Sequence, residues 1–310
     1  MTPDRGSKQR AVTVAHFRVF ARGAVGGNPC PVVAEAAELS PGEMQQIAAH
    51  FGEESGFVSH DADGGLRFRF FMPDCEVPMC VHATVAATTA LVLGGKVHRS
   101  GDLLVRTASG QCHVSWDDGS PMRVNVEQQP PRFGDPVDVA STLEHVFRLE
   151  PGAVDDEKPV RLVSVSAPKL MVPLRSADDV HRTAPDFDLL WTLCRDLETT
   201  GAYVFAPHSD GRAGHFVARQ FPVGGGIRED PATGVAAGAL AAYVADRAKG
   251  KTPAWTAVEI DQGDAMGCPC RLEAAAYAES GEVLRTMVTG SATLEREERL
   301  DLAVAGATGE

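Results

Sequence analysis

Long apolar runs are missing from this sequence of 310 residues. A membrane-spanning helix needs about 20 consecutive apolar residues, and no stretch approaches that length. The first dozen residues, MTPDRGSKQRAV, are polar and lack the apolar centre of a signal peptide. We therefore expect a cytoplasmic protein that does not bind membranes.

Basic runs are also missing, and the formal net charge is −13 at pH 7. Nucleic acids and acidic membrane surfaces are bound through basic patches, so neither is an expected partner. The seven cysteines are an odd number without the spacing of a disulfide framework, which favours reduced thiols. Cys268 and Cys270 flank one proline, too close for half of a zinc ribbon, so we expect no metal.

Nucleotide-binding glycine motifs are absent as well. The glycine run at 224–226 has neither the lysine of a P-loop nor the spacing of a dinucleotide fold. What the chain does contain is a repeat: EVPMCVHATVAATTAL at 76–91 and REDPATGVAAGAL at 228–240, aligned on Val85 and Val235. Each copy follows a strand rich in arginine and phenylalanine. Two related halves are predicted, as the chain length also favours.

Each copy of the repeat ends in a run of small apolar residues without a polar face. Such a run predicts a helix buried on every side, whose first turn presents free backbone N–H groups. Two helix starts that face each other across a seam would favour an anionic ligand, because amide donors and helix dipoles both attract negative charge.

Other elements follow from apolar alternation and turn residues. A helix is predicted from Ser40, where Pro41 and Glu43 complete a capping box, through Phe51. Further helices are predicted at 142–149 and 186–197, a linker at 128–135, and a fraying tail at 302–310. The predicted strands are 11–20, 55–59, 66–71, 103–107, 111–116, 122–126, 161–174 and 202–207, with closing strands that end near residue 293.

Cys80 and His82 stand at the start of the first apolar helix. A helix start can lower the pKa of a thiol, but a cysteine racemase needs a second thiol, and Pro231 with its neighbours supplies none. Packing is therefore the favoured interpretation of Cys80. His82 could donate to a substrate oxygen or carry a proton, although a lone histidine is usually structural. The polar groups of the second copy, Asp230 and Thr233 among them, favour one shared site.

Two further candidates each allow two interpretations. Glu54, with Glu53 before it, is either a solvated loop residue or a carboxylic acid whose pKa is raised by Phe51 and Phe57. Asn28 is either a turn residue chosen for its backbone or a site residue, and the turn is the default.

Together these motifs resemble the phenazine-biosynthesis (PhzF-like) isomerase family, within the diaminopimelate epimerase fold. The resemblance spans nearly the whole chain, and its most specific parts are CVHAT at 80–84 and EDPATG at 229–234. It implies an α+β fold of two pseudo-symmetric domains, each a β-barrel-like sheet wrapped round a central buried helix, with a cleft between them. We expect an N-terminal domain at 11–128, completed by a strand near 287–300, a C-terminal domain at 129–286, and tails at 1–10 and 301–310.

The resemblance also implies roles for single residues. The family's catalytic glutamate falls on Glu54, its histidine on His82 and its aspartate on Asp230. It implies proton transfer without a cofactor on a small carboxylate, and a homodimer. The substrate-binding positions that it implies are Asn28, Cys80, Val81, Ala83, Thr84, Thr233, Gly234 and Val235.

Four positions depart from the family pattern: Val81 replaces a glycine, Val235 a serine, Glu53 a serine and Cys268 an arginine. The first three lie near the expected ligand and put the phenazine precursor itself in doubt as the substrate. An isomerase of secondary metabolism, acting on a small unsaturated amino or carboxylic acid, is the leading hypothesis. An amino-acid epimerase with non-cysteine bases and a non-catalytic carboxylate-binding protein are the alternatives.

Overall fold

The fold comes from a computed structural model that describes residues 10–224, 226–248 and 252–302. Most of the two expected tails, and the middle glycine of the run at 224–226, lie outside these ranges. The helices are α1 (Pro41–Phe51), α2 (Val81–Leu93), α3 (Ala140–Phe147), α4 (Ala177–Arg182), α5 (Phe187–Asp196) and α6 (Gly234–Arg247). In the described part of the chain, no helix combines the length and apolarity that crossing a membrane requires.

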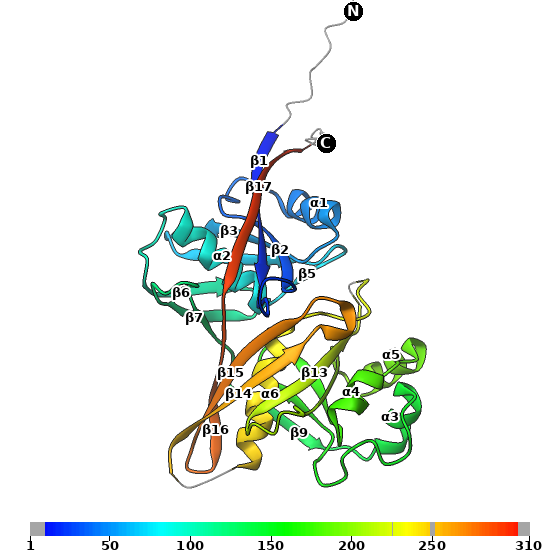
Figure 1. Cartoon of the computed structure of the whole chain (residues 1–310). Coiled ribbons are helices and arrows are strands. Elements are labelled where there is room, and N and C mark those ends of the chain that lie inside the picture. Colours follow the sequence, from blue (N-terminus) through cyan, green and yellow to red (C-terminus); the bar gives the residue numbers. More distant parts are fainter. Residues whose placement is uncertain (1–9, 225, 249–251, 303–310) are drawn as a thin grey trace, which may run out of the picture.

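In the described part of the chain, strands contain more residues than helices do. In the first half they are β1 (Arg10–Val19), β2 (Asn28–Val33), β3 (Ser55–His60), β4 (Leu66–Phe71), β5 (Glu76–Val77), β6 (Gly101–Thr107), β7 (Gly110–Trp116) and β8 (Val124–Glu127). The second half contains β9 (Arg132–Pro136), β10 (Arg161–Ser164), β11 (Pro168–Pro173), β12 (Gly201–Pro207), β13 (His215–Pro222), β14 (Ala254–Gln262), β15 (Cys270–Glu279) and β16 (Glu282–Gly290). The last strand, β17 (Ala292–Leu302), returns to the first half and pairs with β1 (Figure 1).

The two halves share one strand plan, and each encloses a helix. In the first half β2 is parallel to β3 and β4 is parallel to β6, with α1 and α2 in the two crossovers. In the second half β11 is parallel to β12 and β13 is parallel to β14, with α4 and α5 in one crossover and α6 in the other. The expected α+β, epimerase-like fold class is confirmed, with α2 and α6 as the central helices (Figure 1).

The complete burial of α2 follows from its sequence. Every residue from Val81 to Leu91 is buried, because the run has no polar face to turn toward water. Its threonines do not break this rule: the Thr84, Thr88 and Thr89 hydroxyls each donate to the carbonyl four residues earlier, at 2.7 or 2.8 Å. The small residues of α6 are buried in the same way, from Gly234 to Tyr243.

The helix starts correct the alignment of the repeat. Because α2 begins at Val81 and α6 at Gly234, these residues are equivalent, and Val85 corresponds to Gly238 rather than to Val235. The residue equivalent to Cys80 is therefore Thr233, three residues after the Asp230 that the earlier alignment places opposite it. It also lacks a thiol, so the argument against a cysteine racemase is unchanged.

Local signals predicted α1 correctly. Ser40 caps it by accepting from Glu43 N at 3.3 Å, and the Glu43 carboxylate accepts from Ser40 N at 2.7 Å. The single strand predicted at 161–174 is wrong. It is an antiparallel hairpin of β10 and β11, with the turn at 165–167.

The strands near the end of the chain also differ from the prediction. Residues 287–290 belong to β16, which pairs with β15 and with β8 of the first half, whereas β17 pairs with β1. The strand does not stop near residue 293 but continues to Leu302, although its residues are mostly charged and exposed. Its ten-residue pairing with β1 supplies backbone hydrogen bonds that stabilise the strand, although its side-chain pattern does not predict one.

A loop of the first half packs directly on a loop of the second. The N–H groups of Arg22 and Gly27 donate to Pro269 O at 3.1 and 3.2 Å. A Cβ at Gly26 would overlap the Pro269 backbone, and Gly26 also has a φ of +88°. Only glycine combines this conformation with so close an approach, so the GGNP turn is fixed by contact between the halves.

Candidate active site

The candidate site lies where the starts of α2 and α6 meet. The two helices touch at Val81 and Gly234, where an added Cβ on the glycine would overlap the valine side chain. Cys80 is the N-cap residue of α2, and Thr233 is that of α6. Thr233 makes no side-chain cap, so the first-turn N–H groups of α6 stay available to a ligand, as the repeat predicted.

Glu54 extends into this meeting point from the segment between α1 and β3. Its carboxylate, Cys80 Sγ and a ring nitrogen of His82 lie within 4.8 Å of one another, and His82 Nε2 is 3.8 Å from Glu54 Oε2. Burial and the nearby Asp230 carboxylate raise the pKa of Glu54 to about 7. The side chain is nevertheless 19% exposed, so a small molecule can reach it. This carboxyl group can both take and return a proton near neutral pH.

The sequence analysis expected Phe51 and Phe57 to raise the pKa of Glu54, but the structure shows other neighbours. Phe51 and Phe57 pack with α1 in a separate apolar cluster that contains Met44 and Ile47. The groups around the Glu54 carboxyl are instead Cys80, His82 and Asp230. Glu53 is half-buried, which raises its own pKa.

His82 is buried, and burial lowers its pKa to about 4. The imidazole is therefore neutral at pH 7 and offers a hydrogen bond rather than a charge. Its Nδ1 lies 3.3 Å from Cys80 Sγ, a contact that fixes the orientation of the ring.

Cys80 itself is not a thiolate. Burial raises the pKa of its thiol well above the usual value, and its sulfur accepts from Ala83 N at 3.3 Å. The favoured packing interpretation fits this environment.

Asp230 links the two halves through the site. Its Oδ1 accepts from Asn28 Nδ2 at 2.9 Å and from Ala232 N at 3.2 Å, and its Oδ2 accepts from the Thr233 hydroxyl at 2.6 Å. Burial raises the pKa of this carboxyl, while these donors oppose the change. Asn28 is buried at the start of β2 and also donates to Ala232 O at 3.1 Å, so it does more than form a turn.

The remaining predicted positions are less accessible. Val81, Ala83 and Thr84 are buried in α2, and the Thr84 hydroxyl is already bonded to Cys80 O. Val235 is 9% exposed and presents an apolar side chain at the start of α6. If these residues contact a substrate, as predicted, they do so through backbone groups or apolar surface.

Lys169 was missed by the sequence analysis. It lies on β11, is 7% exposed, and has a pKa lowered to about 8, because burial outweighs the attraction of Asp230 and Glu54. In the sequence it appears only as a lysine at the start of the apolar stretch KLMVP, which does not show where its side chain points. Interpretation of 161–174 as one long strand hid the fact that this lysine faces the interior.

Two groups of side chains among the described residues have metal-ligand spacing. One is Glu54, Cys80 and His82, where Cys80 is a protonated thiol already bonded to Ala83 N. The other is His208, Asp210 and His215, where Arg212 already contacts Asp210 and His215 at 2.7 Å. A guanidinium thus occupies the position that a cation would take.

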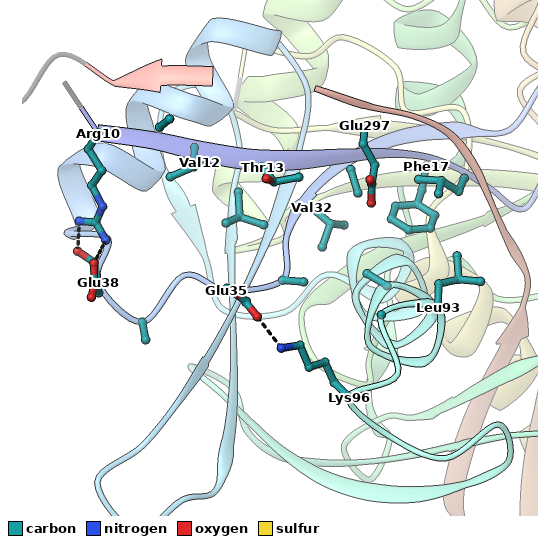
Figure 2. Close-up of a pocket in the computed structure, with 18 residues that line it drawn as sticks. Arg10, Val12, Thr13, Phe17, Val32, Glu35, Glu38, Leu93, Lys96 and Glu297 are labelled. Carbon is teal, nitrogen blue, oxygen red and sulfur yellow. Dashed lines mark hydrogen bonds and ion pairs between the residues drawn. The ribbon is translucent and has the colours of Figure 1, made fainter. Parts of the chain in front are cut away.

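The large cavity drawn in Figure 2 is not this site. Its volume is about 850 Å³, and it lies between β1, β2 and the far end of α2, where Leu93 and Gly94 line it. Its charged rim is paired within itself, Arg10 with Glu38 at 2.8 Å and Lys96 with Glu35 at 2.5 Å. Most of the other lining residues are apolar, with Glu297 of β17 as a third carboxylate, and none of Glu54, His82 and Asp230 is among them.

Comparison with known proteins shows the family to which this chain belongs. The profile of the family described as "Phenazine biosynthesis-like protein" matches residues 17–298. The chain belongs to that family. The expected resemblance to PhzF-like isomerases is thereby confirmed.

Several relatives of this chain carry isomerase names. An "Uncharacterized isomerase" of Deinococcus radiodurans is 32% identical over 281 residues, which cover 87% of this chain and 89% of the relative. The trans-2,3-dihydro-3-hydroxyanthranilate isomerase of Pseudomonas aeruginosa is 28% identical, covering 90% and 96% of the two chains. A PhzF-family protein of Bacillus anthracis has the same fold, with a TM-score of 0.84 at 24% identity over 94% and 99% of the two chains. The predicted enzyme class, an isomerase, is confirmed.

Proposed function

We propose that the protein moves a proton, and with it a double bond, along a small unsaturated amino or carboxylic acid. The observation that carries this proposal is the position of Glu54. It is partly exposed beside His82 and Asp230 at the meeting of two helix starts, and its pKa is about 7. An isomerisation of this kind requires one group that removes a proton from carbon and returns it elsewhere.

In the proposed reaction the Glu54 carboxylate removes a proton from a carbon next to the conjugated system. The double bond shifts as the negative charge spreads toward the substrate carboxylate. The protonated Glu54, whose acid proton can exchange with solvent because the side chain is 19% exposed, then donates a proton to a second carbon, so the substrate and the enzyme both return to their original charge. The first-turn amides of α6 near Thr233 and Gly234 stabilise the carboxylate on which charge accumulates.

His82 and Asp230 would hold the substrate in this scheme. A neutral imidazole donates or accepts a hydrogen bond without changing the charge of the site. Asp230 is held by three donors and suits a hydroxyl or amino group of the substrate. A role in secondary metabolism, as in antibiotic biosynthesis, would fit the phenazine biosynthesis in the family's name.

The test is proton exchange in D₂O with a panel of unsaturated amino and carboxylic acids, in which NMR identifies the carbon that acquires deuterium. We expect Glu54→Gln to lower the exchange rate by about 10² to 10⁴ in both directions, because the amide cannot accept the proton. Glu53→Gln is the matched control, since it makes the same change one residue earlier. Equal exchange by wild type and Glu54→Gln would refute the proposal.

A two-base epimerase is the runner-up, because Asp230 is a second buried carboxyl group near Glu54. In that case Asp230→Asn should stop proton exchange from one substrate enantiomer only. Loss of exchange from both enantiomers in Glu54→Gln supports the isomerase instead.

A further inference from the structure

Two buried polar side chains beside the candidate site have no partner within the described part of the protein. Lys169 is 7% exposed and forms no hydrogen bond or ion pair there. Gln220 is 1% exposed, and neither atom of its side-chain amide is hydrogen-bonded. Burying an ammonium or an amide without a partner is unfavourable, so both groups are suited to a ligand that brings one.

The strand register brings these side chains to one face of the sheet. Met171 of β11 is opposite Tyr203 of β12, which is opposite Gln220 of β13. Lys169 is two residues before Met171 and so points to the same face, toward α6. It lies next to Gly201, and the Gln220 amide nitrogen is 2.6 Å from where a Cβ of that glycine would be. Glycine at 201 therefore leaves room for the amide beside the lysine.

Asp230 joins this group to the catalytic candidates. Its backbone N–H donates to Gln220 O at 3.1 Å. Within the described ranges, Lys169 is the one cation whose charge acts on both Asp230 and Glu54. It makes an ion pair with neither, because Asp230 is already held by Asn28, Ala232 and Thr233, and Glu54 lies on the opposite half.

We propose that Lys169 and Gln220 form a second anion subsite, which binds a carboxylate of the substrate and makes this isomerase selective for small unsaturated dicarboxylic acids. The inference rests on the proposed function, in which the α6 amides hold the first carboxylate. The ammonium attracts an anionic group and repels a substrate ammonium, while the Gln220 amide donates to a carboxylate oxygen. The second carboxylate supplies the negative charge that the protein does not place against Lys169.

Three ligands of similar length test the subsite: glutaconate with two carboxylates, trans-2-pentenoate with one, and 4-aminocrotonate with an ammonium in place of the second. A double-bond shift converts glutaconate into itself, so its binding to active enzyme can be measured at equilibrium by calorimetry. We expect wild type to bind glutaconate at least about tenfold more tightly than either other ligand, as one buried charge pair would provide.

Lys169→Met should remove that preference by weakening glutaconate binding about 10- to 100-fold, with pentenoate binding unchanged within about twofold. Lys169→Arg keeps the positive charge and should therefore retain part of the preference for glutaconate. Lys96→Met is the control, because its ammonium pairs with Glu35 at the far end of α2. Equal binding of the three ligands by wild type would overturn the proposal, whether or not any variant folds. An equal loss of glutaconate and pentenoate affinity in Lys169→Met would also overturn it.

The failure of this proposal can be told apart from failure of the proposed function. Deuterium exchange that persists in Glu54→Gln, with glutaconate preference still dependent on Lys169, would refute the proton-transfer role and leave the subsite. Exchange that depends on Glu54, with no preference for glutaconate, would refute the anion subsite and leave the proton-transfer role of Glu54 intact.

Discussion

Glu54 and Asp230 are two partly buried carboxyl groups whose different environments favour different roles. Asp230 accepts three hydrogen bonds, which favour its anion even though burial opposes it. Glu54 has fewer donors and feels the Asp230 charge, so its pKa rises to about 7. A pair whose environments separate the two pKa values gives one group that exchanges protons and one that stays charged.

This difference predicts the pH dependence of kcat/KM, because the proposed reaction begins with proton abstraction by Glu54 in either direction. Glu54 must be ionised, so activity rises as pH increases through about 7. Lys169 must be protonated to hold the second carboxylate, so activity falls as pH increases through about 8. We expect a narrow bell-shaped plot of kcat/KM against pH, with its maximum between these two pH values. Initial rates over pH 5 to 10 would measure it.

Lys169→Arg should move the alkaline limb of that bell to higher pH, because a guanidinium stays protonated. The acidic limb should not move, since Glu54 is intact. An alkaline limb that is identical in wild type and Lys169→Arg would show that another group limits activity at high pH.

Sequence motifs found Glu54, His82 and Asp230 because each stands in a short, unusual stretch. They could not find Lys169 and Gln220. Lys169 is the one polar side chain of β11, and Gln220 follows Arg219 in β13, but the role of each depends on strand register and on the room left at Gly201. These are facts of tertiary structure that neighbouring residues do not encode.

At the scale of elements, the contact between α2 and α6 sets the site. Gly234 packs against Val81 so closely that a Cβ would overlap the valine. Gly234→Ala should force the helix starts apart, lowering stability by about 1–3 kcal/mol and kcat/KM by about 10²-fold, because a shift near 1 Å misplaces Glu54 against the α6 amides. Thermal unfolding and exchange rates would measure the two effects.

The chain offers both a rescue and a control for that substitution. Val81→Gly removes the overlapping side chain and should restore much of the activity when combined with Gly234→Ala. Gly42→Ala lies in α1 with no atom near the added methyl group and should leave activity unchanged. Loss of activity in Gly42→Ala, or full activity in Gly234→Ala, would contradict the importance of this contact.

Elements with local signals were predictable, and elements defined by distant pairing were not. The capping box of α1 and the apolar run of α2 are local sequence patterns, each of which predicts its helix from a few neighbouring residues. The β10–β11 hairpin was mistaken for one strand because its turn, 165–167, has no glycine or asparagine. Short β9 and charged β17 become strands by pairing with β10 and β1, which no local pattern shows.

At the scale of the whole molecule, the chain joins its halves twice. It leaves the first half between β8 and β9, and it returns between β16 and β17 (Figure 1). The paired β8 and β16 continue the sheet from one half to the other, and Arg285 adds an ion pair to Glu127 at 2.7 Å. The site takes Glu54 and His82 from one half and Asp230 from the other, so its geometry depends on how the halves are joined.

This arrangement predicts that a chain ending at Gly290 cannot keep its first half folded. Without β17, ten residues of β1 lose their ladder partner on one side and present an unpaired edge, which favours aggregation. We expect the shortened protein to lose proton exchange and to elute as aggregate in size-exclusion chromatography. A synthetic peptide of residues 291–302, added during refolding, should recover part of the monodisperse fraction, because it restores the pairing without the covalent link. A shortened chain that is soluble and active without the peptide would show that β17 is dispensable, and that the halves are held by the β8–β16 junction alone.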